Sequence, residues 1–172
     1  MGGDEFMKLK IYMWFGVGLI AFLLTGCAGT SGVNANVRVA AASYLNPSDS
    51  GEASPVTLTF YELKSLAAFK QADYFDLDSS AASVLNSDLI DKQSIEVRPG
   101  EVVKHSLLLS EGVKYVGITA GYRNIDQSVW RATVPVVDKK SHLGKLKAWK
   151  KQKKINIYIH LQSQQLIASL KN

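Results

Sequence analysis

The sequence predicts an all-β protein, a two-sheet β-sandwich of about eight strands, with one or two short helices between the second and third strands. Three observations predict it. Apolar and polar residues alternate with a period of two in many short stretches, turn-forming residues separate these stretches about every eight to twelve residues, and apolar residues at helical spacing are confined to one region. A parallel α/β sheet would instead alternate its strands with longer helices.

Strand periodicity begins at residue 33 and continues almost to the end of the chain. In residues 33–41, Val and Ala at the odd positions alternate with Asn34, Asn36 and Arg38, the pattern of a strand with one buried face. Further strands are expected at residues 56–63, 94–98, 102–109, 113–123, 128–137, 155–161 and 165–170.

Two prolines refine this pattern. Pro99 opens the sequence Pro-Gly-Glu between the strands expected at 94–98 and 102–109, and Pro followed by Gly favours a tight turn, so we expect these strands to form a hairpin. Pro135 lies inside an otherwise central-looking strand. Because proline cannot donate a ladder hydrogen bond, that strand should have an exposed edge or a bulge there.

The helical region follows the second strand. Residues 65–72 and 79–85 are rich in Ala, carry apolar residues at helical spacing and are bounded by Ser, Asp and Asn. We expect one or two short helices here, packed on the sandwich.

Residues 1–26 have the features of a secretory signal peptide. After Lys8 and Lys10, residues 11–24 form an uncharged run of fourteen residues, which fits an h-region but is shorter than the roughly 20 residues that a membrane span needs. Met7 opens a typical n-region, so residues 1–6 are interpreted as an upstream mis-start or a cloning remnant. The chain is therefore expected to be exported.

The cleavage point is more specific. Leu24-Thr25-Gly26-Cys27 resembles the bacterial lipobox, in which the cysteine is acylated and becomes the new amino terminus. Two or three acyl chains anchor a protein stably. Cys27 is therefore the expected lipidation site, with residues 27–32 as a short tether and 33–172 as the β-sandwich domain. Ala28 in place of an inner-membrane-retaining Asp favours the outer membrane, facing the periplasm.

Composition and motifs argue against catalysis. The chain has 172 residues, and its single cysteine excludes an internal disulfide. The three histidines, His105, His142 and His160, fall on separate elements without metal-ligand spacing. There is also no nucleophile elbow and no phosphate-binding Gly-rich loop. We expect no enzyme activity, no metal, no small-molecule substrate and no cofactor other than the covalent lipid on Cys27.

A long loop is the first candidate for binding. Residues 43–55 connect the first two strands with thirteen residues, well beyond the two to five of a hairpin. The loop carries Tyr44 and Leu45, which a purely solvated loop does not need. Either they contact a partner or they tuck back against the core edge.

A lysine-rich segment is the second candidate. Residues 139–154 hold eight of the chain's 20 Lys and Arg residues. Export excludes nucleic acid, which leaves anionic lipid headgroups, peptidoglycan, an acidic protein patch or a solvated loop. The candidate basic patch consists of Lys145, Lys147, Lys150, Lys151, Lys153 and Lys154.

The order of several short motifs resembles a known family. They are Leu45-Asn46-Pro47, Ser54-Pro55-Val56, Phe60-Tyr61-Glu62-Leu63, Ala72-Asp73-Tyr74-Phe75, Arg98-Pro99-Gly100-Glu101, Val116-Gly117-Ile118, Tyr122-Arg123 and Trp130-Arg131. Behind a lipobox, this ordered set is similar to the TssJ (SciN) family, outer-membrane lipoproteins of the type VI secretion system. The dense lysine segment departs from the family pattern.

The resemblance implies a fold, a partner and a site. The fold is a transthyretin-like β-sandwich without enzyme activity. The partner is the periplasmic C-terminal domain of the inner-membrane IcmF-like protein TssM, with TssL an indirect neighbour. The site is the loop joining the first two strands, here residues 44–50. In our hypothesis Tyr44 and Leu45 supply apolar anchors, Asn46-Pro47 a fixed turn, and Ser48, Asp49 and Ser50 polar rim contacts.

Two rival interpretations remain at this level. One is a periplasmic lipoprotein that binds peptidoglycan or lipid headgroups through the lysine-rich segment. The other is a small enzyme on a transthyretin-like sandwich, such as the hydrolases of ureide metabolism, which would need a clustered His/Arg site that this sequence does not predict.

Overall fold

The computed structural model describes residues 32–136 and 155–171. The chain divides into two compact units, Met1–Thr30 and Ser31–Asn172, and the described residues belong to the second. The expected signal peptide, Cys27 and the lysine-rich segment therefore lie outside the described residues.

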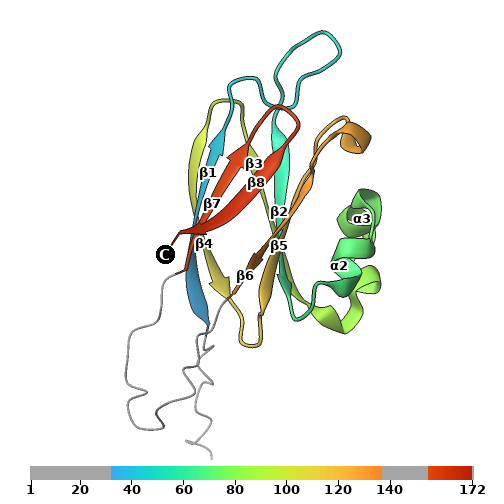
Figure 1. Ribbon diagram of the computed structural model, residues 1–172, viewed down its shortest axis with the longest axis vertical. Coiled ribbons are helices and arrows are strands. Elements are labelled where there is room, and N and C mark those ends of the chain that lie inside the picture. Colours follow the sequence, from blue (N-terminus) through green and yellow to red (C-terminus); the bar gives the residue numbers. More distant parts are fainter. Residues whose placement is uncertain (1–31, 137–154, 172) are drawn as a thin grey trace, which may run out of the picture. The chain divides into compact units, whose positions relative to one another are not determined.

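The described residues form a β-sandwich of two four-stranded sheets (Figure 1), which confirms the predicted fold class. Sheet A has the order β4-β1-β7-β8, and sheet B has the order β3-β2-β5-β6. The strands are β1 (Val33–Ala41), β2 (Val56–Leu63), β3 (Leu89–Val97), β4 (Val102–Leu109), β5 (Tyr115–Ala120), β6 (Arg131–Pro135), β7 (Ile155–Leu161) and β8 (Leu166–Lys171). All neighbours are antiparallel except β1 and β7, which are parallel.

The predicted hairpin between residues 94–98 and 102–109 is wrong. β3 pairs with β2 in sheet B, whereas β4 pairs with β1 in sheet A, so the turn at Pro99–Glu101 carries the chain from one sheet to the other. The turn is held by Glu101, whose carboxylate accepts from the backbone N–H of Arg98 at 2.9 Å, and by Gly100 with φ of 72°. A Pro-Gly turn is compatible with either topology, so the turn residues alone could not decide between them.

Some strand boundaries also differ from the prediction. β3 begins at Leu89 rather than residue 94, because its polar residues 91–94 hide the alternation. β5 ends at Ala120 and β6 begins only at Arg131. Pro135 lies exposed on β6, an edge strand of sheet B, which is the first of the two alternatives that the proline predicted.

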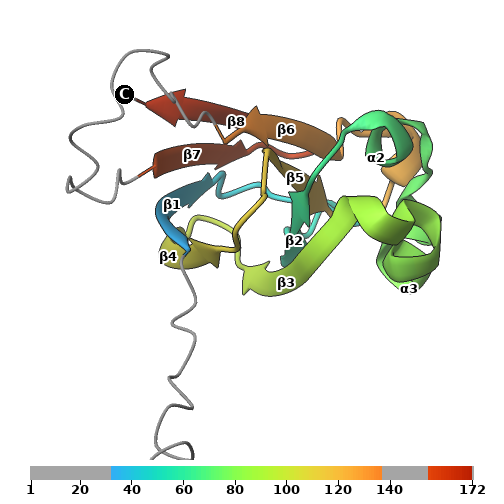
Figure 2. The same cartoon turned by 90° about the horizontal axis from the view of Figure 1, so that it is seen from below.

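Both expected helices are present on the outer face of sheet B, as Figure 2 shows. They are α2 (Ala67–Gln71) and α3 (Tyr74–Leu85), followed by the 3-10 turns η2 (Asn86–Asp88) and, after β5, η3 (Ile125–Gln127). α3 begins at Tyr74 rather than residue 79, because the side chain of Asp73 accepts from the N–H of Asp76 at 2.8 Å and caps the helix there.

The core has two parts. The main cluster fills the space between the sheets, with Val37, Leu58, Phe60 and Ile118 among its buried residues. A smaller cluster around Phe69 lies between sheet B and the helices. No helix covers the outer face of sheet A in the described part of the chain (Figure 2).

Arg131 fastens the helices to sheet B. Its Nη1 donates to the carbonyl oxygens of Phe69 at 2.6 Å and Ala72 at 2.9 Å, at the end of α2. Its guanidinium also lies 4.5 Å from the ring centroid of Trp130. Burial lowers the pKa of Arg131. Gly117 permits the close approach of α2, because a Cβ there would lie 2.7 Å from the Phe69 ring.

Candidate partner-binding loop

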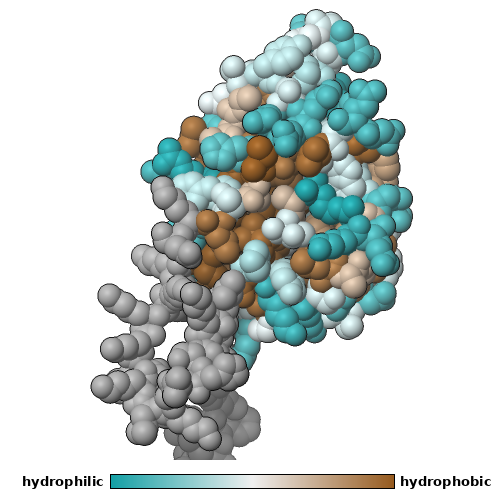
Figure 3. Space-filling model, in the orientation of Figure 1, coloured by the Kyte–Doolittle hydropathy of each residue, from teal (hydrophilic) through white to brown (hydrophobic). Residues whose placement is uncertain are grey.

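The loop of residues 42–55 crosses from β1 in sheet A to β2 in sheet B and projects from one end of the sandwich, at the top of Figure 1. Two other connections contact its base. The backbone of Ala42 bonds to Leu161 and Gly100, and the N–H of Asn46 donates to Ser163. Hydrophilic and intermediate side chains cover this end of the molecule in Figure 3.

Leu45 does not have the role that the sequence suggested. Its side chain is fully buried in the main core cluster, with 0% exposure. In this structure it is therefore unavailable as an apolar anchor for a partner, and the alternative that it tucks into the core is correct. Burial of a leucine stabilises the folded state by about 1.5–3 kcal/mol, which fixes the entry into the loop.

Asn46 organises the base of the loop. It is 4% exposed and has a left-handed backbone, with φ of 46°, a region that Asn tolerates better than most residues. Its Nδ2 donates to the carbonyl of Pro55 at 2.9 Å, and its Oδ1 accepts from the backbone N–H of Arg123 at 2.7 Å. The chain bends at Asn46, and these two hydrogen bonds of its side chain hold the bend.

The loop tip is a closed turn of residues 48–52. The N–H of Ser48 donates to the carbonyl of Glu52 at 2.8 Å, and the N–H of Glu52 donates back to the hydroxyl of Ser48 at 3.1 Å. Gly51 turns the chain with φ of 84°. At the base, the N–H of Ser54 donates to Leu45 at 2.9 Å. These bonds hold the tip in one conformation before any partner arrives, which lowers the entropy cost of binding.

Tyr44 is the large apolar side chain that the loop exposes. It is 53% exposed, in contrast to its neighbour Leu45. Its hydroxyl lies 3.5 Å from the position of a Cβ on Gly51, so the ring extends toward the tip. Exposed tyrosines combine a large contact area with a polar end and are common anchors at interfaces.

The tip is acidic. Asp49 and Glu52 are exposed, and neither forms an ion pair within residues 32–136 and 155–171. Ser50 is exposed and shares a 2.8 Å hydrogen bond with the hydroxyl of Ser48, which is half-buried and also accepts from Glu52. A complementary surface would therefore offer cations or hydrogen-bond donors beside a site for the Tyr44 ring.

Sequence reasoning missed the supports supplied by distant segments. The alternation predicts that Tyr122 and Arg123 continue a strand, but the chain leaves the sheet after Ala120 and these two residues run under the loop. The Arg123 guanidinium donates to the hydroxyl of Ser54 at 3.2 Å. Tyr122 donates to the carbonyl of Gln162, and burial raises the pKa of its phenol above the ordinary range. The pair Gly121-Tyr122 was a signal that the strand ends early.

The histidines do not form a site. His105 stacks on Phe60 with ring centroids 5.9 Å apart, His160 is exposed, and His142 lies outside the described residues. Among the residues that the structure describes, no three His, Cys, Asp or Glu side chains gather as a metal site would require. Nor does any described helix have the length and apolarity to span a bilayer.

Comparison with known proteins identifies the family. Residues 33–164 match the family described as type VI secretion lipoprotein (VasD, EvfM, TssJ). This chain belongs to that family. The family consists of structural, membrane-associated lipoproteins and is not an enzyme family. A search of curated proteins found no match.

Solved structures agree with the assignment to the TssJ family. The lipoprotein TssJ1 of Pseudomonas aeruginosa is 31% identical, with a TM-score of 0.69 over 83% of this chain and 98% of that one. Serratia marcescens Lip, a membrane-bound component of the type VI secretion system, is 24% identical, with a TM-score of 0.70 over 83% and 99%. A chain in a structure of the TssM C-terminal domain from EAEC is 20% identical and shares the fold, with a TM-score of 0.60 over 78% and 98%.

Proposed function

We propose that this lipoprotein anchors the periplasmic C-terminal domain of a TssM-like inner-membrane protein to the outer membrane, with TssL as an indirect neighbour. Membership of the type VI secretion lipoprotein family supports the proposal. A chain of similar fold, 20% identical with a TM-score of 0.62, occurs in a structure described as a type VI membrane complex, which is consistent with a place in such an assembly.

The anchor is the lipid expected on Cys27. Removal of the signal peptide of residues 1–26 would leave an acylated Cys27, such as a palmitoylated one, followed by a tether up to residue 32. Because two or three acyl chains hold a protein on a membrane stably, the described domain would need no membrane span of its own.

One geometric observation carries the proposal: the rigid tip and the tether attachment lie at opposite ends of β1. The tether enters at Val33 and the loop leaves after Ala41, nine residues later. At about 3.4 Å per residue, β1 separates them by about 30 Å. A domain tethered at one end therefore presents Tyr44 and the acidic tip at its other end, where an inner-membrane partner can reach them.

In this arrangement Tyr44 is the apolar anchor, and Asp49, Ser50 and Glu52 make polar contacts around it. Leu45 and Asn46 act indirectly, since both are buried and hold the loop. The proposed contact surface therefore omits Leu45 and Asn46 and adds Glu52.

Binding to the purified periplasmic domain of TssM tests the proposal. Tyr44→Ala, and separately Asp49→Lys with Glu52→Lys, should weaken binding by about tenfold or more, since loss of a central interface aromatic costs at least ~1.4 kcal/mol. Phe75→Ala is the matched control, because Phe75 is a 67% exposed aromatic on α3, away from the loop. Full binding by both loop variants, with their thermal midpoints unchanged, would refute the proposal.

A further inference from the structure

Two opposite sides of the sandwich carry charges of opposite sign. One side is the outer face of sheet A, and the other is the helix-covered side of sheet B, as Figure 2 shows. Both sides run along the strands, between the end where the tether enters and the end that carries the 42–55 loop. A second copy that is anchored beside the first through its own Cys27 would therefore meet one of these two sides.

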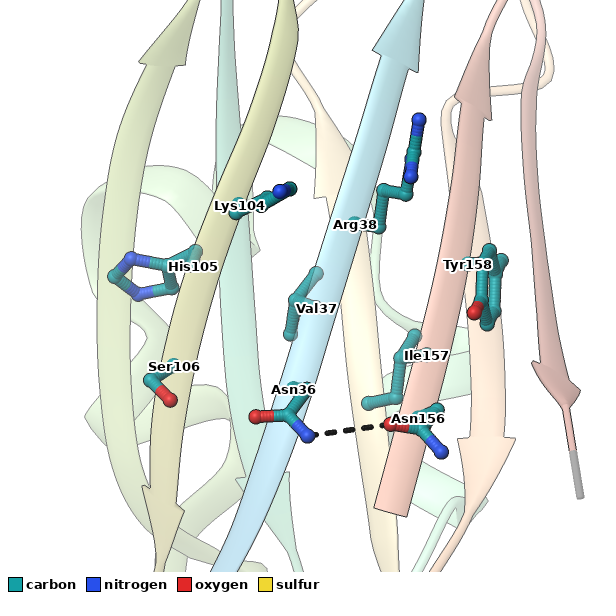
Figure 4. A pocket seen from close by; sticks show the side chains of 9 residues that line it. All are labelled: Asn36, Val37, Arg38, Lys104, His105, Ser106, Asn156, Ile157 and Tyr158. Atoms are coloured by element: carbon teal, nitrogen blue, oxygen red, sulfur yellow. Dashed lines mark hydrogen bonds between the residues drawn. The ribbon is translucent and has the colours of Figure 1, made fainter. Parts of the chain in front are cut away.

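The outer face of sheet A is cationic at its centre. Strand register places Arg38 of β1 directly opposite Lys104 of β4, and both line a groove of about 380 Å³ that crosses β4, β1 and β7 (Figure 4). Both side chains are exposed, and neither forms an ion pair with another described residue. The described outward positions of the four strands hold no Asp or Glu. Because like charges directly opposite each other destabilise an antiparallel pair, carboxylates from a partner would relieve this repulsion.

Apolar side chains border this cationic centre. Val102 and Leu108, at the two ends of β4, are 53% and 51% exposed, and Ile167 on β8 is 39% exposed. All three alternate with residues that pack in the core, which places them on the outer face of the sheet. Exposed apolar side chains around an arginine suit a protein partner. The cationic face is defined here as Arg38, Lys104, Val102, Leu108 and Ile167.

The helix-covered side has complementary features. Residues 67–85 hold three Asp and one Lys. Asp76 and Asp78 of α3 are exposed, and neither forms an ion pair with another described residue. Phe75, beside them on the same helix, is 67% exposed, and its ring packs edge-on against Tyr74 with the centroids 5.5 Å apart. The helix thus presents an aromatic ring next to two carboxylates. The acidic face is defined here as Phe75, Asp76 and Asp78.

We propose that the cationic face of one copy of this chain binds the acidic face of the next copy. The carboxylates would lie against Arg38 and Lys104, and the ring of Phe75 against the apolar border. Because the two faces differ, the contact is heterologous and repeats from copy to copy, which gives a row or a closed ring. Copies tethered by the same end share one orientation on the membrane, and a contact between opposite sides requires this orientation.

This contact is separate from the binding of TssM, which the proposed function assigns to the loop at the end of the sandwich. It rests on the proposed function only for the Cys27 anchor, which gives the copies their shared orientation. Lateral contacts would present several 42–55 loops side by side, at the same distance from the membrane.

Energy transfer between full-length copies in the same vesicles tests the proposal. Donor and acceptor fluorescent proteins are fused to the C-terminus, and the lipoprotein is reconstituted in vesicles of phosphatidylethanolamine and phosphatidylglycerol. The cationic-face variant carries Arg38→Glu and Lys104→Glu, and the acidic-face variant carries Asp76→Lys and Asp78→Lys. Each should weaken the contact by about tenfold or more, because each brings like charges together across the interface.

Charge exchange separates loss of contact from loss of folding. A chain with all four substitutions again has opposite charges on its two faces, so energy transfer should return. A mixture of the two variants should also show transfer, because every contact between them joins opposite charges. The matched control is Lys64→Glu with Lys114→Glu, which makes the same charge change at two exposed lysines at the end of β2 and the start of β5, and it should leave transfer unchanged.

Three results would overturn the proposal. The first is a parent protein whose energy transfer is no higher than that of either variant. The second is transfer that both variants lose but that neither the fourfold variant nor the mixture restores. The third is a parent protein that does not float with the vesicles, because the shared orientation would then be absent.

The two proposals can fail separately. Both face variants should bind the purified TssM domain as the parent protein does, because their substitutions lie outside the 42–55 loop. Phe75→Ala should lower energy transfer while its binding to TssM is unchanged. Normal TssM binding without lateral transfer would therefore contradict only the contact between copies, and the converse result would contradict only the role of the loop.

Discussion

The side-chain oxygen of Asn46 accepts a 2.7 Å hydrogen bond from the backbone N–H of Arg123, a residue 77 positions away. The same asparagine donates to Pro55 and receives support from Ser163 through its backbone. Through its side chain and its backbone N–H, this one buried residue connects the candidate binding loop to two other connections at that end of the sandwich.

Replacement of Asn46 should therefore destabilise the protein strongly. Asn46→Ala removes two part-buried hydrogen bonds and leaves φ of 46° without the side-chain bonds that stabilise it, so we expect a loss of about 2–4 kcal/mol in the free energy of unfolding. Denaturant titration measures it. Asn46→Gly, which relieves the backbone strain, should lose about 1 kcal/mol less; equal losses would contradict the strain argument.

Substitutions of the neighbours Tyr44 and Leu45 should affect different properties, binding to TssM for Tyr44 and stability for Leu45. Leu45→Ala opens a cavity in the core and should cost about 2–5 kcal/mol, whereas Tyr44→Ala at an exposed site should change stability by less than about 0.5 kcal/mol. Parallel thermal melts and TssM-binding assays check this. A large stability loss in Tyr44→Ala would show that the ring packs on the domain and is no free anchor.

Arg131 should control the attachment of the helices. Arg131→Ala leaves the Phe69 and Ala72 carbonyls without their donor and removes the stacking on Trp130, so we expect a loss of about 1.5–3 kcal/mol. Arg131→Lys should recover only part, because an ammonium lacks the planar fork. Hydrogen exchange should show faster exchange in residues 67–85 than in β1. Uniform acceleration across both sheets would contradict a local role.

Alkaline pH should lower stability through buried tyrosines. Burial raises the pKa of Tyr61, Tyr74 and Tyr122 in the folded protein, whereas the unfolded phenols ionise near the usual value of about 10. Their contribution to stability is therefore complete below a pH of about 10. It is lost as the pH rises toward the raised folded values, because only the unfolded state then releases protons.

Thermal midpoints measured between about pH 8 and 11 check this dependence. Tyr122→Phe removes one of the three phenols and should make the alkaline fall shallower. Tyr44→Phe changes an exposed ring and serves as the control. A Tyr122→Phe curve parallel to that of the parent protein would show that this phenol makes no contribution.

Much of the fold followed from local patterns. The alternation in residues 33–41 predicted β1 over its full length. Pro135 predicted an exposed edge or a bulge, and β6 is an edge strand of sheet B. These properties depend on which side of a single strand faces solvent, and the order of polar residues, apolar residues and proline in that strand indicates this.

The candidate site was predictable only in part. The length of the loop and its aromatic residue indicated a binding site, but the residue pattern gave no reason to expect different burial for Tyr44 and Leu45. Their different burial depends on where the backbone passes over the core, and the left-handed turn at Asn46 sets that path. Arg123 and Ser163 support the loop through backbone atoms, and such contacts cannot be predicted from residue types.

The sequence by itself determined the fold class, the strand periodicity, the added helices and the resemblance to the TssJ family, because each of these depends on residues close together in the chain or on motif order. Only the tertiary structure decided which sheet each strand joined, that Pro99–Glu101 crosses between sheets, and that Arg38 faces Lys104 across β1 and β4. Those relationships arise from pairing between segments far apart in sequence, and local patterns carry no information about the partner that a strand edge selects.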